Sequence, residues 1–169
     1  AKDLCYVAGK NDDKYQIIET NLVTNATRVA HEGPDQITGI RVLAKKNVIL
    51  FSDAAGFVQA ADIESGKIQW RTKGHSKYAL DISYSKSEKL IASSGADGNV
   101  AIFNLQGELQ KKIPVSNDWV REVCFSNASN MLVAGTENGE LYQIKPKQDY
   151  TIEKIRIEPL KGNITEIAL

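Results

Sequence analysis

Residues 74–104 read GHSKYALDISYSKSEKLIASSGADGNVAIFN, and this stretch decides the fold. It holds short runs of β-branched, aromatic and aliphatic residues rather than a helical pattern. The tetrapeptide Gly95-Ala-Asp-Gly98 is a turn signal between two of these runs. The run before it, Leu90 to Ala92, is continuously apolar, which is typical of a strand buried on both faces. A further strand, Asn99 to Leu105, follows the turn, so the stretch predicts antiparallel strands joined by tight turns.

The same pattern recurs along the whole chain. The turn glycines Gly56, Gly98 and Gly139 lie 42 (98 − 56) and 41 (139 − 98) residues apart. A more polar strand closes each unit, and we expect it to face solvent at an outer edge. Four strands in about 40 to 45 residues are typical of one β-propeller blade. Four segments with apolar first and fourth residues mark the period, beginning 42 (79 − 37), 41 (120 − 79) and 44 (164 − 120) residues apart: Ile37-Thr-Gly-Ile40, Ala79-Leu-Asp-Ile82, Val120-Arg-Glu-Val123 and Ile164-Thr-Glu-Ile167.

We therefore expect an all-β fold, a single β-propeller segment over residues 1–169 with about sixteen strands in four-stranded antiparallel blades, or about four blades. The alternatives for closure are a larger propeller of which this chain is part, a tight four-bladed ring closed by its last residues, and an eight-bladed ring of two copies. The approximate repeats are 1–36, 37–78, 79–119 and 120–163, with 164–169 as the first strand of a next or closing blade.

Residues 74–104 resemble the WD-repeat family, and the resemblance extends over residues 37–169. In that family a Gly-His dipeptide, a serine on the second strand, an aspartate in the next turn and a third-strand tryptophan form a hydrogen-bonded cluster that holds a blade together. Three elements match: Gly74-His75, Ser93 or Ser94, and Asp97; Phe103 stands in place of the tryptophan. The resemblance implies that His75, the serine and Asp97 are structural. Gly98 is expected to need a positive φ.

A second segment, Ala61-Asp-Ile-Glu-Ser-Gly-Lys-Ile-Gln-Trp70, resembles the docking motif of quinoprotein-type propellers. In that family a glycine and a later tryptophan lock adjacent blades. This resemblance implies, as an alternative, a quinoprotein-like enzyme or assembly factor, whose quinone pocket needs a metal carboxylate and cationic ligands. The sequence offers one copy of the motif and no such cluster. The spacing Ser85-x-x-x-x-Leu-Ile-Ala-Ser-Ser94 favours the WD-repeat family.

Composition and motifs favour a non-enzymatic intracellular protein. The 21 Lys+Arg balance 21 Asp+Glu, so no basic patch indicates nucleic acid or a membrane surface. No secretory leader is recognised, and we expect a cytoplasmic protein. Only two histidines occur, and no catalytic or metal-binding motif is found, which predicts no enzyme activity, cofactor or metal. We expect His31 to face solvent in a loop and His75 to be structural.

These observations predict a protein–protein interaction scaffold, or alternatively a purely structural propeller segment within a large complex. Loops on a rigid scaffold are where binding residues concentrate. The WD-repeat resemblance implies that the residue before each first strand opens onto the narrower top face. Those residues are Gln36, Tyr78, Trp119 and Asn163, with Lys77, Asp118 and Arg121 as their polar neighbours.

The expected partner is one or more proteins, and self-association or the remaining blades of the same protein are alternatives. Tyr and Trp are enriched at interface hot spots, which favours Tyr78 and Trp119 as anchors. The competing interpretation is that both aromatic side chains pack between neighbouring blades.

Overall fold

The computed structural model describes residues 3–126, 130–155 and 162–167. Two short 3₁₀ turns, η1 (Ala44–Lys46) and η2 (Pro146–Gln148), accompany the strands in this part of the chain. No helix in the described ranges is long and apolar enough to cross a membrane. The strands are β1 (Leu4–Asn11), β2 (Lys14–Asn21), β3 (Thr27–Gly33), β4 (Ile37–Leu43), β5 (Val48–Asp53), β6 (Phe57–Asp62), β7 (Ile68–Lys73), β8 (Ala79–Ser85), β9 (Leu90–Gly95), β10 (Asn99–Phe103), β11 (Leu109–Pro114), β12 (Val120–Ser126), β13 (Met131–Thr136), β14 (Leu141–Lys145) and β15 (Thr151–Ile155).

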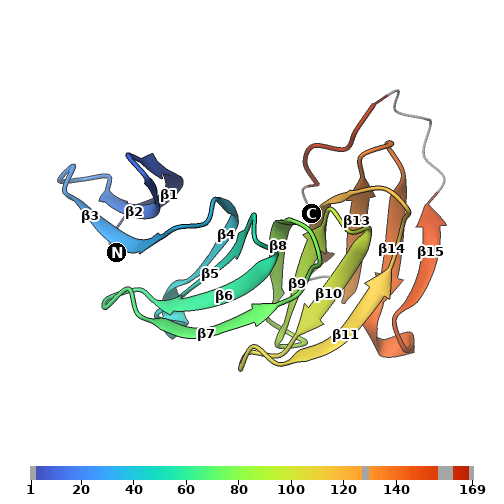
Figure 1. Cartoon of the computed structure of the whole chain (residues 1–169). Coiled ribbons are helices and arrows are strands. Elements are labelled where there is room, and N and C mark those ends of the chain that lie inside the picture. Colours follow the sequence, from blue (N-terminus) through green and yellow to red (C-terminus); the bar gives the residue numbers. More distant parts are fainter. Residues whose placement is uncertain (1–2, 127–129, 156–161, 168–169) are drawn as a thin grey trace.

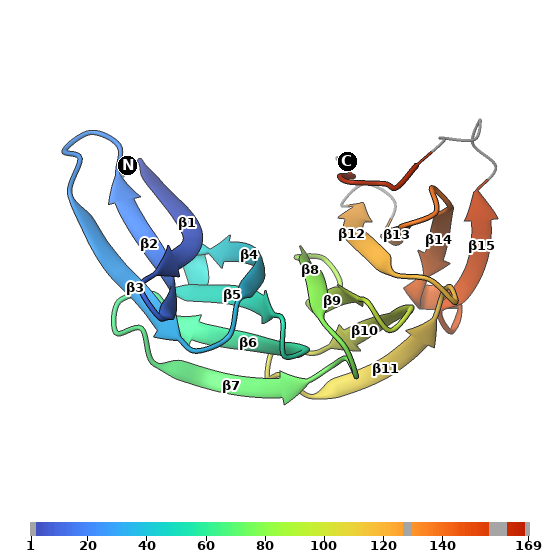
Figure 2. The same ribbon diagram turned by 45° about the horizontal axis from the view of Figure 1, so that its top comes forward.

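The strands form four antiparallel meanders, which we number blades 1 to 4 (Figure 1). Blade 1 has three strands, β1 to β3, and blades 2, 3 and 4 have four each, β4 to β7, β8 to β11 and β12 to β15. The blades stand side by side along an open arc, with β4, β8 and β12 on its concave side and β7 and β11 on its convex side (Figure 2). The expected all-β propeller architecture is confirmed.

One expectation about the end of the repeat needs correction. The described residues contain fifteen strands, in line with the expected number of about sixteen, but residues 164–167 are not a strand. Ile164 instead packs on Gly135, and its N–H donates to Thr136 O (3.1 Å) in blade 4. In blades 2 to 4 the first strand is paired with the second strand of its own blade, and residues 164–167 have no such partner. Blades 1 and 4 lie at opposite ends of the arc, so the described residues do not form the tight four-bladed ring (Figure 2).

Burial explains the sequence pattern within a blade. The second strand β9 is almost completely buried, whereas the fourth strand β11 is exposed at all but one of its positions. A strand with a neighbour on each edge and a blade on each face needs apolar side chains throughout, and the outermost strand does not. The polar closing strands therefore lie where the sequence predicted them.

The apolar core lies between blades rather than within them. One cluster joins blades 1 and 2 around Ile17 and Phe51, a second joins blades 2 and 3 around Leu50 and Phe103, and a third joins blades 3 and 4. Each blade thus buries its faces against its neighbours, as expected for stacked repeats that cannot bury a core alone.

The last strand of each of the first three blades reaches the last turn of the next blade from one equivalent position. His31, Trp70 and Lys111 occupy this position, opposite Ile17, Ala60 and Ile102 and next to a register shift. Their partners lie near the ends of the third strands. His31 Nδ1 is 3.4 Å from Gly66 O, and Lys111 Nζ is 3.5 Å from Asp149 Oδ1.

The Trp70 contact is the most closely packed of the three. Its Nε1–H donates to Leu105 O (3.1 Å), and Thr72 Oγ1 donates to Gly107 O (2.7 Å). A Cβ on Gly107 would lie 2.4 Å from the Trp70 ring, so only glycine leaves room for the indole. The motif at residues 61–70 thus supplies a tryptophan that locks blade 2 to blade 3.

The Trp70 lock gives a prediction about stability. Gly107→Ala should lower the free energy of unfolding by about 1–3 kcal/mol, because the indole must move away from its packed position. Chemical denaturation monitored by Trp fluorescence measures this change. Gly9→Ala is the matched control, since a Cβ there meets nothing within 4 Å. Equal destabilisation by the two variants would contradict the lock.

Candidate functional site

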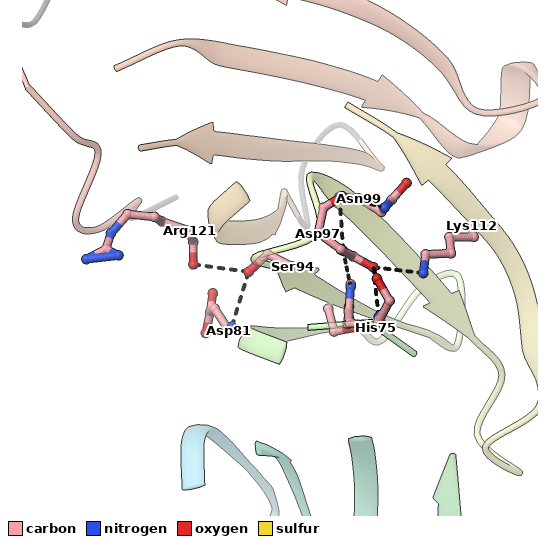
Figure 3. Close-up of polar contacts among 9 residues, drawn as sticks. His75, Asp81, Ser94, Asp97, Asn99, Lys112 and Arg121 are labelled. Carbon is pink, nitrogen blue, oxygen red and sulfur yellow. Dashed lines mark hydrogen bonds and ion pairs between the residues drawn. The ribbon is translucent and has the colours of Figure 1, made fainter. Parts of the chain in front are cut away.

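A buried polar cluster holds blade 3 together (Figure 3). His75 is 1% exposed; its Nε2 is 2.8 Å from Ser93 Oγ and its Nδ1 is 2.9 Å from Asp97 Oδ1. Asp97 also accepts the Ser76 N–H (3.0 Å) and pairs with Lys112 Nζ (2.8 Å) on β11. The turn carboxylate therefore connects the loop before β8 with the outermost strand of the same blade.

Asp97 is held as a carboxylate. Burial alone would raise its pKa, but hydrogen bonds from His75, Lys112 and the Ser76 N–H outweigh burial and lower the pKa well below its usual range. Phe103, in the place of the family tryptophan, is fully buried, and a Cβ on Gly74 would lie 2.9 Å from its ring. The buried polar groups of this cluster have hydrogen-bond partners, so the cluster is suited to a structural role rather than to catalysis.

Ser94, the other serine considered, lies outside this cluster and connects two blades. Its Oγ accepts the Asp81 N–H (3.1 Å) and donates to Arg121 O (3.0 Å) on β12, as Figure 3 shows. The Thr38 hydroxyl makes a similar connection to Ala79 O (2.6 Å) between blades 2 and 3. These bonds fix the first strands against one another and make the concave side of the arc rigid.

The residues before the first strands occupy one equivalent place in successive blades. The carbonyls of Gln36, Tyr78 and Trp119 accept the N–H groups of Ala54, Ala96 and Glu137, with N···O distances of 2.8–2.9 Å. The bond ties each residue to the turn between the second and third strands of its own blade. Asn163 is exposed and has no following blade among the described residues to provide this bond.

Two of these residues form an aromatic pair. The Tyr78 and Trp119 rings are 6.2 Å apart at 82°, an edge-to-face arrangement. Tyr78 is 50% exposed and Trp119 is half-buried. The Arg121 guanidinium lies 5.9 Å from the Trp119 ring centroid and pairs with Glu137 (3.0 Å). We call Tyr78 and Trp119 the aromatic pair.

The other candidate residues lie in three different places. Gln36 and Arg121 line one cavity of about 300 Å³, together with Thr38, Leu80, Glu122 and Thr165, on the concave side. Lys77 is exposed in the loop before Tyr78. Asp118 lines a different cavity, between blades 3 and 4. Gln36 and Arg121 therefore line the same cavity, whereas Asp118 lines another.

Sequence reasoning missed a pair of acids on the concave side. Asp81 and Glu122 occupy the third position of the repeated first-strand segments, on neighbouring blades. Asp81 Oδ2 accepts the Val123 N–H (3.2 Å), and Oδ1 is 3.7 Å from Arg41. Burial raises the pKa of both carboxyls, and burial with the nearby Asp81 raises that of Glu122 to about 7. The sequence does contain a pattern that indicates these acids, because Asp81, Glu122 and Glu166 occupy the same position in successive repeats.

The raised pKa of Glu122 predicts a pH dependence of stability. A carboxyl that binds its proton more tightly when folded stabilises the fold below its unfolded pKa of about 4.3, and this contribution is lost as pH rises through about 7. We expect the melting temperature to fall across this window by a few degrees, equivalent to about 1 kcal/mol after allowance for solvent screening. Thermal unfolding at several pH values measures this change.

Glu122→Gln tests the assignment, because glutamine is neutral at every pH and should flatten the profile. Asp12→Asn, in the exposed turn after β1, is the control and should keep the profile of the natural chain. A profile that Glu122→Gln leaves unchanged would show that another group titrates.

His31 contradicts the expectation of a solvent-facing loop residue. It lies in β3, and its ring centroid is 4.7 Å from that of Phe51 in blade 2. Burial lowers its pKa. Its equivalence to Trp70 explains the discrepancy, since both side chains fill the junction to the next blade. The described residues contain no group of three or more His, Cys, Asp or Glu side chains placed to hold a metal ion.

Comparison with known proteins agrees with this geometry. Residues 66–104 match the family model described as "WD domain, G-beta repeat". The structure is similar to a chain in the crystal structure of a mitotic checkpoint complex, with a TM-score of 0.75 and 11% sequence identity over 86% of this chain and 45% of that chain. This chain therefore spans less than half the length of the chain it matches, and at this identity the likeness concerns the fold. The matched residues include the whole His75, Ser93 and Asp97 cluster. The chain thus has a β-propeller fold, and its residues 66–104 match a WD40 repeat.

Proposed function

We propose that this chain is a protein-interaction scaffold that binds a partner through the face carrying the aromatic pair. The observation that carries the proposal is Tyr78, a large aromatic residue that is 50% exposed although the adjacent Trp119 holds it in an edge-to-face contact. A preorganised aromatic side chain buries much area in a partner at little entropic cost. Lys77, Asp118, Arg121 and Gln36 supply polar groups around the pair, as the rim of an interface requires. The WD40 repeat supports an interaction scaffold in general terms.

The competing roles are weaker. If the aromatic pair served only to pack blade 3 against blade 4, we would expect Tyr78 to be buried, whereas half of its surface is exposed to solvent. The docking motif at residues 61–70 is accounted for by the Trp70 lock, which is a contact between blades and does not call for a quinone. We therefore do not propose an enzymatic function for this chain. A structural segment of a larger assembly remains compatible with the same face, since that assembly would supply the partner.

Substitution of Trp119 tests the proposal. Trp119→Ala should reduce affinity for the physiological partner about thirtyfold, or about 2 kcal/mol, with the fold intact. The partner is first identified by affinity capture on the purified chain, and its affinity is then measured by calorimetry.

Leu109→Ala is the control, because Leu109 is also a large apolar side chain at the surface (43% exposed) but lies on the outer strand β11. Circular dichroism establishes whether each variant is folded. If the partner binds folded Trp119→Ala as tightly as the natural chain, or if this variant cannot fold, the aromatic pair is not the binding site.

A further inference from the structure

The junction between blades 3 and 4 lacks the polar cluster found in blade 3. One period of 41 residues after His75, Ser93 and Asp97 stand Ser116, Ala134 and Asn138. The imidazole, hydroxyl and carboxylate are thus replaced by a small hydroxyl, a methyl and an amide. The Asn138 side chain contacts Thr136 Oγ1 (2.5 Å), and Ser116 Oγ accepts the Asp118 N–H (3.1 Å). Neither replacement makes the contacts with the second strand and the following turn of its own blade that His75 makes in blade 3.

A cavity of about 550 Å³ lies at this place, and we call it the junction cavity. Both Ser116 and Asn138 are in its wall. In blade 3 the equivalent position is occupied by the fully buried His75 ring, which contacts Ser93 and Asp97. In blade 4 the smaller Ser116 stands at this position and lines the junction cavity. Its wall is made of Pro114, Val115, Ser116, Asn117, Asp118, Asn138, Glu140 and Tyr142.

The charged groups of the wall favour a cation. Asp118 accepts the Trp119 N–H (2.8 Å) and has no ion pair with any described residue. Glu140 also lines the cavity, where it accepts the Tyr142 hydroxyl (2.7 Å) and pairs with Lys154.

Three nearby cations are already paired, whereas Lys77 lies one repeat away in the loop before Tyr78. Lys112 pairs with Asp97 (2.8 Å), Arg121 with Glu137 (3.0 Å) and Lys154 with Glu140. The Asp118 carboxylate is thus left to attract a positive charge from outside, and Asn117 and Asn138 add amide oxygens that can accept its hydrogen bonds.

The aromatic pair adjoins the wall of the junction cavity, because Trp119 directly follows Asp118 in the sequence. We propose that the partner segment is extended and basic, inserting a Lys or Arg side chain into the junction cavity while an apolar neighbour rests on the aromatic pair. This inference rests on the proposed function and names the chemistry of the partner. Electrostatic complementarity of this kind provides specificity and speeds association.

Short synthetic peptides test the charge requirement directly. The probes are fluorescein-labelled peptides with a central Arg or Lys flanked by Leu, Phe or Trp in Gly-Ser linkers, and matched peptides with citrulline, the neutral isostere of Arg. Fluorescence polarisation with the purified chain measures binding. We expect at least one basic peptide to bind about tenfold more tightly than its citrulline counterpart. Binding should weaken as salt is added.

Two variants assign the effect to the cavity. Asp118→Asn keeps an acceptor for the Trp119 N–H and should abolish the preference for Arg over citrulline. Asp12→Asn makes the same change of charge in blade 1 and should preserve it. The proposal is overturned if no basic peptide binds the natural chain at up to about 1 mM, if citrulline peptides bind equally well, or if Asp118→Asn retains the preference. If Trp119→Ala still weakens the physiological complex in any of those cases, the proposed function stands and only the basic segment is wrong.

Discussion

Asp97→Ala is expected to lower the free energy of unfolding by about 2–3 kcal/mol, because it leaves buried donors without their acceptor. The fully buried His75 would lose its partner at 2.9 Å, and Lys112 would lose its ion pair at 2.8 Å. For a chain of 169 residues this corresponds to a melting temperature lower by about 5–10 °C. Differential scanning calorimetry measures both quantities.

The effect of Asp97→Ala should also depend on pH. The folded pKa of Asp97 is lowered, because hydrogen bonds from His75 and Lys112 outweigh the opposing effect of burial. A lowered pKa contributes stability above the unfolded value of about 3.9, and this contribution is lost as pH falls below it. The natural chain and Asp97→Ala should therefore become more similar in stability below about pH 4. Asp13→Ala, in the exposed turn after β1, is the control. If Asp97→Ala is no more destabilising than Asp13→Ala at pH 7, the cluster does not hold the blade together.

The period of the chain was predictable because local signals repeat. Turn residues such as Gly56 and Gly139, and the apolar second strands before them, depend only on neighbours in sequence. The structure accordingly begins strands β4, β8, β9, β10 and β12 at the expected residues. The cluster around His75 was predictable from the resemblance, since three matching residues occur at the expected spacing. The choice between Ser93 and Ser94 was not, because it depends on which face of β9 meets the imidazole.

The contacts between blades could not be predicted from the sequence. Trp70 was noticed, but its partner Gly107 lies in the next repeat and carries no signal of its own. From the sequence, His31 is expected in a solvent-facing loop, yet strand β3 continues to Gly33 and the His31 ring lies against Phe51 of the next blade. The junction cavity likewise lies where blade 4 differs from blade 3. The replaced residues can be read from the sequence, but the cavity beside them is seen only in the structure.

Gly98→Val is expected to have the largest effect on stability, at about 3–5 kcal/mol. Gly98 has φ of +77°, a region that a β-branched residue strongly disfavours. A Cβ there would also lie 2.0 Å from Ser116 O, a backbone atom fixed because the Val115 and Ser116 N–H groups donate to Gly98 O. Chemical denaturation measures the loss. Gly98→Asn separates the two causes, because asparagine tolerates the positive φ but keeps the Cβ clash.

The control for Gly98→Val is Gly9→Val, at a β1 position where a Cβ meets no atom within 4 Å. We expect the control to change stability by less than about 1 kcal/mol, because valine is favoured in strands and meets no clash. The site also matters for the partner, since Gly98 O holds Val115 and Ser116, and the loop that begins there carries Asp118 and Trp119. A folded Gly98→Asn variant should therefore bind the physiological partner less tightly than the natural chain. Stability of Gly98→Val equal to that of Gly9→Val would mean that this turn does not constrain the blade.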